Sequence, residues 1–235
     1  AVELVPPQGG SVTGARKYKY GEQATLTATP NSRYVFSHWT STEHSPGSTS
    51  SEWTVAVPPT DVTITAYFLP TYMVAVSANP SVGGSVSGAG EYPQGTTVTL
   101  NAVPSIDTGY EFVDWTLGGI AVSTDEEYVF SATGDEKDLS LVANFRLRTE
   151  EIALAASPSW AVSSLTGAGT YTYGGAVTLS AVPNKDYQFV RWTEAGADVS
   201  HNAQYQFSAA RDPNIDRRAF VAHFELRPGT FGVEP

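Results

Sequence analysis

The sequence predicts an all-β, or nearly all-β, protein made of three tandem modules of about 76 residues each. One ten-residue phrase occurs three times along the chain, which is typical of a repeat architecture. Each copy contains about six short runs that are β-branched, aromatic or alternating, and Gly, Pro, Asn and Asp separate these runs. No window keeps apolar residues at spacings of three and four over a helix length, so any helix is expected to be a single turn.

The ten-residue phrase begins with Gly and ends in Leu-x-Ala-x-Pro. It lies at residues 21–30, 95–104 and 174–183. In the second copy, the runs that we expect to form strands lie near residues 74–78, 84–92, 97–103, 110–117, 126–132 and 139–145.

Two aromatic motifs follow the phrase in every copy. Tyr-x-Phe-x-x-Trp recurs with its Trp residues 76 and 77 positions apart, and Ala-x-Phe closes each copy. Burying such a ring contributes on the order of 4–6 kcal/mol as an upper estimate, which a small module needs for its own stability. We therefore expect these rings to form the three cores rather than platforms for a sugar. The predicted core residues are Phe36, Trp39, Phe68, Phe112, Trp115, Phe145, Phe189, Trp192 and Phe224.

The spacing inside the first aromatic motif predicts a β-bulge. Alternation places Tyr34 and Phe36 on one face of a strand, whereas Trp39 lies three residues after Phe36 and so belongs to the other face. A bulge after the Phe returns the Trp to the core side and leaves His38 facing water. The counterparts of His38 are Asp114 and Arg191, and three such different polar residues suit a solvent-facing position.

The third copy departs from the others at the turn that precedes its polar strand. Val162-Ser163 stand where Gly9-Gly10 and Gly83-Gly84 do in the first two copies. Either the turn does not require positive φ at these sites, or it is rebuilt in the third copy.

The copies define three modules and a tail. We place the modules at residues 1–70, 71–149 and 150–227, and a tail or linker at 228–235. The links at 69–72 and 146–151 are too short for free tumbling, and Pro70 stiffens the first of them. We therefore expect a semi-rigid, extended row of modules.

The combined motifs resemble the divergent internalin-B-type B repeat, also called a Listeria-Bacteroides repeat. The second copy carries the resemblance best, in its segments 83–88 and 109–115, and the likeness extends over residues 1–226. It implies a small β-grasp-like module, found in strings on bacterial surface and secreted proteins as a stalk, an adhesion segment or an accessory to a catalytic domain. It implies no catalytic residues. Arg33 and Asp186 depart from the pattern, because they replace the Gly before Tyr.

Composition excludes several classes of partner. The net charge of −11, from 13 Lys and Arg against 24 Asp and Glu, repels a phosphate backbone, so nucleic acid is not an expected partner. The small basic clusters are expected to be solvated; they are Arg16, Lys17 and Lys19, and Arg211, Arg217 and Arg218. No stretch approaches eighteen apolar residues, so we expect no membrane insertion. The chain begins inside a strand-like pattern, which suggests a monomeric fragment of a longer protein.

We found no pattern that predicts catalysis, a metal or a cofactor. There is no Cys, and the four His residues fall at variable surface positions or in polar loops: His38, His44, His201 and His223. The acidic runs 125–127 and 135–138 match no Ca²⁺ loop and are expected to be solvated hairpin turns. We therefore expect no enzyme activity from this segment.

Trp160 is the best candidate for a ligand contact. It occurs only in the third copy, in the first turn, where Val82 stands in the second. The favoured hypothesis is a non-catalytic tandem-repeat segment of an extracellular or cell-surface bacterial protein, a spacer and an adhesion module for a host protein, another extracellular protein or a glycan. The first alternative is a carbohydrate-binding accessory region of a secreted enzyme. The second is an enzyme whose active site forms between modules.

Overall fold

The fold is built from strands. A computed structural model describes residues 1–209 and 217–229, so Arg211 of the second basic cluster and most of the tail lie outside the described residues. Within the described ranges there is no α-helix, and the helical segments are three single 3₁₀ turns, at Pro7–Gly9, Ile106–Thr108 and Ser159–Ala161. The predicted all-β class is thereby confirmed.

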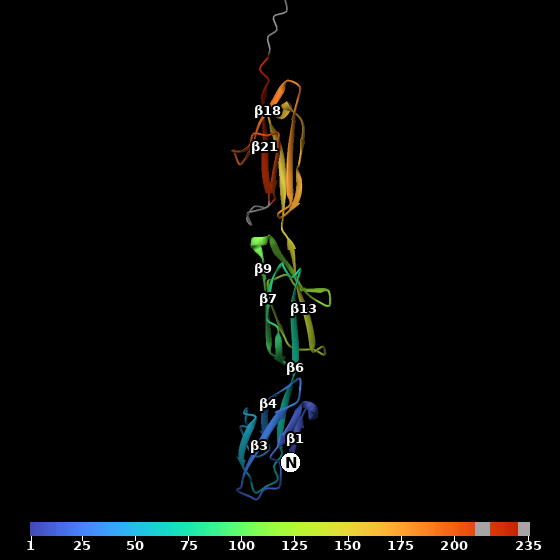
Figure 1. Cartoon of the computed structure of the whole chain (residues 1–235). Helices are drawn as coiled ribbons and strands as arrows, with labels where there is room; N and C mark the ends of the chain where they lie inside the picture. Colours follow the sequence, from blue (N-terminus) through green and yellow to red (C-terminus); the bar gives the residue numbers. More distant parts are fainter. Residues whose placement is uncertain (210–216, 230–235) are drawn as a thin grey trace, which may run out of the picture. The chain divides into compact units, whose positions relative to one another are not determined.

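Each copy folds into a group of strands joined by turns (Figure 1). The first module contains β1 (Val2–Val5), β2 (Gly10–Thr13), β3 (Gln23–Pro30), β4 (Tyr34–Ser41), β5 (Glu52–Ala56) and the first half of β6 (Ile64–Asn79). The second contains the rest of β6, β7 (Gly84–Ser87), β8 (Gly90–Pro93), β9 (Thr97–Pro104), β10 (Tyr110–Leu117), β11 (Ile120–Ser123), β12 (Glu127–Ser131) and β13 (Asp138–Leu147). The third contains β14 (Thr149–Ser157), β15 (Val162–Thr166), β16 (Gly169–Thr172), β17 (Ala176–Pro183), β18 (Tyr187–Glu194), β19 (Ala197–Ser200), β20 (Gln204–Ser208) and β21 (Arg217–Leu226).

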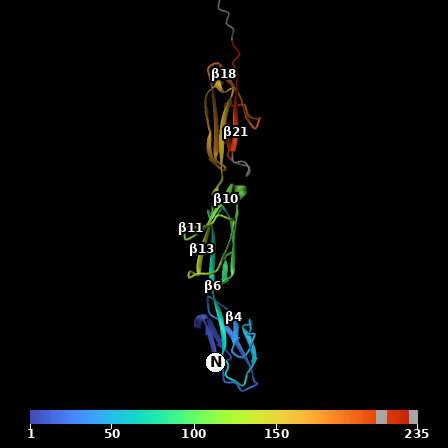
Figure 2. The same ribbon diagram turned by 180° about the vertical axis from the view of Figure 1, so that it is seen from behind.

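Each module consists of two sheets, and the third module shows the arrangement most completely. One sheet has the strand order β16-β14-β21-β18-β19, and the other has the order β15-β17-β20. The first and last strands, β14 and β21, pair in parallel, and β21 also pairs antiparallel with β18. Figures 1 and 2 show β18 and β21 side by side from opposite directions.

The same pairing recurs in the other two modules. In the first, β1 pairs in parallel with β6, β4 pairs antiparallel with β6, and the second sheet is β2-β3-β5. In the second, β8, β6, β13, β10 and β11 follow one another in a sheet, and the other sheet is β12-β9-β7. The strand β6 therefore belongs to both modules, without a break between its halves.

The chain divides into two compact units. One unit holds residues 1–77, 86–102 and 114–143, and the other holds 78–85, 103–113 and the described residues from 144 onward. The second module thus contributes to both units.

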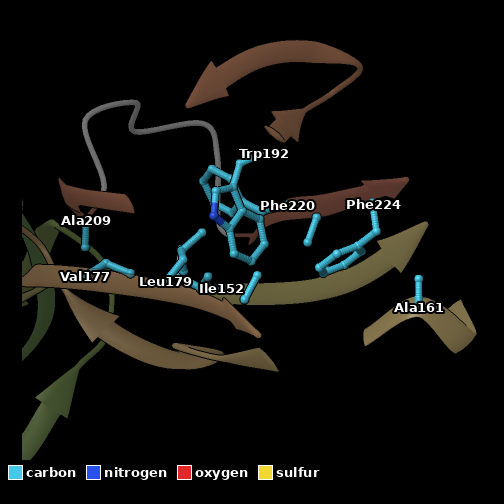
Figure 3. Close-up of a cluster of buried hydrophobic side chains, with 10 residues drawn as sticks. Ile152, Ala161, Val177, Leu179, Trp192, Ala209, Phe220 and Phe224 are labelled. Carbon is cyan, nitrogen blue, oxygen red and sulfur yellow. The ribbon is translucent and has the colours of Figure 1, made fainter. Parts of the chain in front are cut away.

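Apolar side chains from both sheets of a module meet in one core. In the third module, β17 alternates so that Val177, Leu179 and Ala181 point inward, as a half-buried strand does. Trp192 of β18 and Phe220 of β21 face them from the other sheet (Figure 3). The first module has a matching cluster that contains Leu26, Ala28, Trp39, Val55, Ile64, Ala66 and Phe68.

A bulge interrupts the strand that carries the central Trp. Between Phe36 and His38 the register of β4 against β6 shifts, so Ser37 is the extra residue. The same shift lies between Phe189 and Arg191 in β18. Both shifts lie after the Phe, where the offset in the aromatic motif predicts them, and they turn the following Trp toward the core.

The replacement of the Gly pair in the third module lies one residue earlier than the sequence alignment placed it. The backbone N–H groups of Gly9, Gly83 and Ala161 donate equivalent hydrogen bonds, each to the carbonyl of the Pro three residues before, at 2.9, 2.8 and 3.1 Å. Ala161 and Val162 therefore replace the pair, and the assignment of Ser163 was wrong. The sequence alignment assumed the same number of residues between this turn and the next Tyr in every copy. It failed because β15 contains one extra residue, which a register shift against β17 absorbs.

Close packing keeps the first residue of each pair small. None of the residues in these pairs has a φ in the left-handed region that favours Gly, so the first of the two alternatives for the turn holds. A Cβ at Gly9 would lie 2.6 Å from the Cβ of Phe68, which packs over the turn. In the third module Ala161 is buried in the same cluster as Phe224, so its methyl group is part of the core.

Candidate functional site

The three repeated Trp side chains lie inside the modules. Trp39, Trp115 and Trp192 are 1%, 0% and 0% exposed. Each indole N–H donates to the backbone carbonyl of the residue eleven positions later, at 2.9, 3.3 and 3.2 Å. Both the ring and its polar atom are thus used within the fold, and none of the three can stack on an external ligand.

The repeated Phe residues surround the Trp rings. Phe36 and Phe189 are half-buried and lie 5.4 and 5.8 Å, centroid to centroid, from the Trp of their own module. Three edge-to-face pairs, each with centroids 5.8 or 5.9 Å apart, join the two Phe residues of a module; they are Phe36 with Phe68, Phe112 with Phe145, and Phe189 with Phe224.

The four His residues are separated and locally engaged. His38 stacks on Tyr67 with ring centroids 4.5 Å apart, and a hydrogen bond of 3.0 Å joins His223 of β21 to Thr193 of β18. His44 contacts the carbonyl of Ala56, and His201 lies on an exposed turn beside Asp198. Among the residues that the structure describes, the contacts of these His side chains do not join a nucleophile, a base and an orienting acid.

The acidic runs are solvent-facing turns. Asp125 to Glu127 are exposed, and Asp138 forms an ion pair of 2.6 Å with Arg33. Among residues 1–209 and 217–229, no three His, Cys, Asp or Glu side chains come together in a way that could hold a metal ion.

One buried ionic cluster was not predicted from the sequence, and the expectation that Arg218 is solvated was wrong, because its side chain is only 19% exposed. Glu150 is 1% exposed, and its Oε1 lies 3.7 Å from Nη1 of Arg218, while neither of its carboxylate oxygens has a hydrogen-bond partner among the described residues. Arg218 donates to both carboxylate oxygens of Glu194, at 2.5 and 2.8 Å, and its guanidinium lies over the rings of Phe207 and Phe220. The hydrogen bond to Glu194 raises the pKa of Arg218, against the lowering effect of burial. In the sequence, the only indication of this cluster is that Glu150 occupies the position that Tyr72 holds in the second module.

Trp160 lies on the surface. It belongs to the 3₁₀ turn Ser159–Ala161 and is 70% exposed. Its indole N–H donates to the hydroxyl of Tyr187 at 3.0 Å, and its carbonyl accepts a hydrogen bond from the side chain of Asn184. One hydrogen bond therefore holds the ring and another holds its backbone, while most of the ring surface is free to meet a ligand.

Two groups of contacts lie where one module continues into the next. At the first, Nη2 of Arg33 donates to the carbonyl of Lys137 at 3.0 Å as well as to Asp138. At the second, the Tyr173 hydroxyl donates to the carbonyl of Asp107 at 3.1 Å. These contacts restrain the links beyond what chain length alone does.

The positions before the motif Tyr make the same backbone hydrogen bond in all three copies. The carbonyls of Arg33, Gly109 and Asp186 each accept a backbone hydrogen bond from the residue that lies three positions after the closing Phe, at 2.9, 2.8 and 2.9 Å. Arg33 adopts a φ of 67°, a conformation that favours Gly.

Comparison with known proteins identifies the repeated unit. The family model of the divergent InlB B-repeat domain matches three segments, residues 1–71, 74–149 and 156–226. The chain belongs to the divergent InlB B-repeat family. The resemblance stated from its motifs is thereby confirmed. Each B-repeat carries one buried repeated Trp, and in the first and third the first and last strands pair in parallel.

Two solved structures are similar to this string of B-repeats. The TIE protein of Bacillus anthracis matches with a TM-score of 0.33 at 8% identity, over 91% of this chain and 57% of that protein. The pilus adhesin SpaC of Lactobacillus rhamnosus GG matches with a TM-score of 0.24 at 10% identity, over 76% of this chain and 36% of that one. At these values neither likeness bears on function. A comparison with curated proteins found no match.

The described B-repeats contain no helix that is long and apolar enough to cross a membrane.

Proposed function

We propose that the chain is a non-catalytic spacer segment of a bacterial cell-surface or secreted protein. The observation that carries this proposal is the continuous strand β6, which pairs with β1 and β4 in its first half and with β8 in its second. A link that is itself a paired strand cannot bend freely, because bending breaks ladder hydrogen bonds on both sides of it. Stiffness is the property that a spacer needs.

Membership of the B-repeat family supports the extracellular setting of this proposal, and the buried repeated aromatics support its non-catalytic character. All three Trp rings are used for stability, and the His side chains are occupied by local contacts. The acidic net charge of −11 supports partners other than nucleic acid.

Small-angle scattering tests the spacer. A compact module of this size has a radius of gyration of about 11–12 Å, so three in line give roughly 26–28 Å, against ~17–18 Å for a single globule of the whole chain. We expect the higher range. A value below about 20 Å means that the modules fold back on one another and removes the basis for the proposal.

A matched variant tests whether β6 is the source of the stiffness. An eight-residue Gly-Ser insertion between Pro70 and Thr71 interrupts β6 and leaves both modules their own strands. We expect a broader distribution of maximum dimensions than in the parent chain. Identical distributions contradict the role assigned to β6.

A carbohydrate-binding accessory region is the second candidate, and Trp160 is the observation that favours it. An exposed indole that is held in place by hydrogen bonds presents a preformed apolar platform. A glycan array with the parent chain, Trp160→Ala and Ile120→Ala tests it, since Ile120 is also an exposed apolar residue. Binding that only Trp160→Ala abolishes establishes this function, whereas an array without binding, or binding that both variants keep, excludes it.

A further inference from the structure

The first and last strands of the third module form a parallel pair inside a sheet. Residues 151–157 of β14 lie level with residues 217–223 of β21, which gives seven paired positions. β16 flanks β14 on one side and β18 flanks β21 on the other, so the pair is internal to the sheet. Ile152, Phe220 and Ala222 of these two strands face the core and are 1%, 0% and 0% exposed. The core therefore keeps water away from one face of this ladder.

This arrangement places the pair in shear when the chain on either side of the module is pulled. The beginning of β14, at Thr149, lies toward the beginning of β21, whereas the end of β21, at Leu226, lies toward the opposite end of the sheet. Tension between these two residues therefore acts along both strands, in opposite directions. The hydrogen bonds of the ladder connect one strand to the other, so they share the load and must break together before the strands can slide.

Two ion pairs cross the same two strands near the beginning of β14. Arg217 contacts Glu151 at 3.7 Å. Arg218 contacts the buried Glu150 at 3.7 Å. Arg218 is level with Ile152, so Glu150 lies nearer the start of β14 than its partner does. Sliding β14 toward its own start separates Glu150 from Arg218 further, and separating a buried ion pair is costly. The ionic cluster therefore opposes the same motion as the ladder.

We propose that the third module is a mechanical clamp, which bears tension along the chain through the ladder between β14 and β21. The proposal rests on the spacer function and goes beyond it, because a spacer needs only stiffness, whereas a segment under tension needs a high barrier to forced unfolding. The first module uses the same element, since β1 pairs in parallel with β6, and β6 continues into the second module.

Two variants of identical composition test the clamp on the full chain. The chain contains no Cys, so two introduced Cys residues are the only attachment points for the DNA handles of optical tweezers. The first variant, Thr149→Cys/Arg217→Ser/Leu226→Cys, is pulled in shear. The second, Thr149→Cys/Arg217→Cys/Leu226→Ser, is pulled from the same end of both strands, so its ladder opens one pair at a time.

The two variants are matched in everything except the direction of the load. All three substituted side chains are exposed, and both variants lack the surface ion pair of Arg217. We therefore expect equal equilibrium stabilities, because surface substitutions of this kind cost little. The handles attach within the third module, so the other two modules bear no load. Unfolding of the module separates the handles by roughly 220–250 Å in both variants, which identifies the event.

We expect the median unfolding force of the first variant to be at least about twofold that of the second at the same pulling rate. A smaller ratio, or a lower force in the first variant, overturns the clamp, because resistance then does not depend on the direction of the load. Scattering measures how the modules are arranged, whereas these forces come from the third module alone. The clamp and the spacer can therefore fail separately.

Discussion

The ring of Tyr173 packs against the backbone of Gly109. A Cβ built on Gly109 would lie 2.1 Å from Cγ of Tyr173, and Gly109 also has a φ of +83°. Arg148 completes the contact, because its guanidinium lies over the Tyr173 ring and Nη2 donates to the carbonyl of Ile106 at 3.0 Å. Both the backbone conformation and the close approach therefore require Gly at this position.

We expect Gly109→Ala to be more destabilising than Gly95→Ala. Gly95 has a similar φ of +87°, but nothing lies within 4 Å of a Cβ built there, so its substitution costs only the ~1–2 kcal/mol of the left-handed conformation. Gly109→Ala carries a further cost in stability, because the new methyl group must displace the ring of Tyr173. Trypsin cleavage after Arg148 measures this effect and should accelerate only in Gly109→Ala. Equal cleavage of the two variants contradicts the role of the Tyr173 contact.

Trp115→Ala should lower the free energy of unfolding by about 3–5 kcal/mol, the range for truncating a large buried aromatic side chain, and should unfold the second module. Trp160→Ala is the control, since a side chain that is 70% exposed contributes little to stability. Thermal unfolding followed by circular dichroism compares the two. An unchanged melting temperature in Trp115→Ala shows that the assignment of this ring to the core is wrong.

Arg218→Leu should destabilise the third module by about 3–5 kcal/mol, because it leaves Glu150 buried without a compensating charge. The second module has Tyr72 and Leu139 at the two equivalent positions, so the double variant Glu150→Tyr/Arg218→Leu replaces the ion pair with a combination that the repeat already uses. We expect the double variant to regain most of the lost stability in urea unfolding.

A double variant that is less stable than Arg218→Leu alone contradicts this account of the pair.

The raised pKa of Arg218 also sets the direction in which the stability of the fold depends on pH. A group whose pKa is raised on folding stabilises the fold below its unfolded pKa and loses that contribution only as the pH rises through the folded value. The guanidinium therefore stays charged over the whole range in which the protein can be studied.

Assays with peptide, ester and glycoside substrates should show no turnover. The His side chains lie apart from one another, and His38 and His223 have local partners that occupy them. Reproducible turnover that disappears on one acidic substitution, such as Glu194→Gln, would establish an active site and refute the non-catalytic proposal.

The sequence by itself determined the repeat, the all-β class and the bulges before Trp39 and Trp192. These features are local or repeated, since alternation over a few residues sets which face a side chain joins, and a threefold pattern shows which positions share a role. The three-residue offset between Phe36 and Trp39 was therefore enough to predict the register shift at Ser37.

Only the tertiary structure decided which unrepeated residues meet. Glu150 and Arg218 lie far apart in the chain and come together because the first and last strands of the third module pair in parallel, which no local pattern encodes. The extra residue in β15 was missed for the same reason, since a bulge is defined by its partner strand.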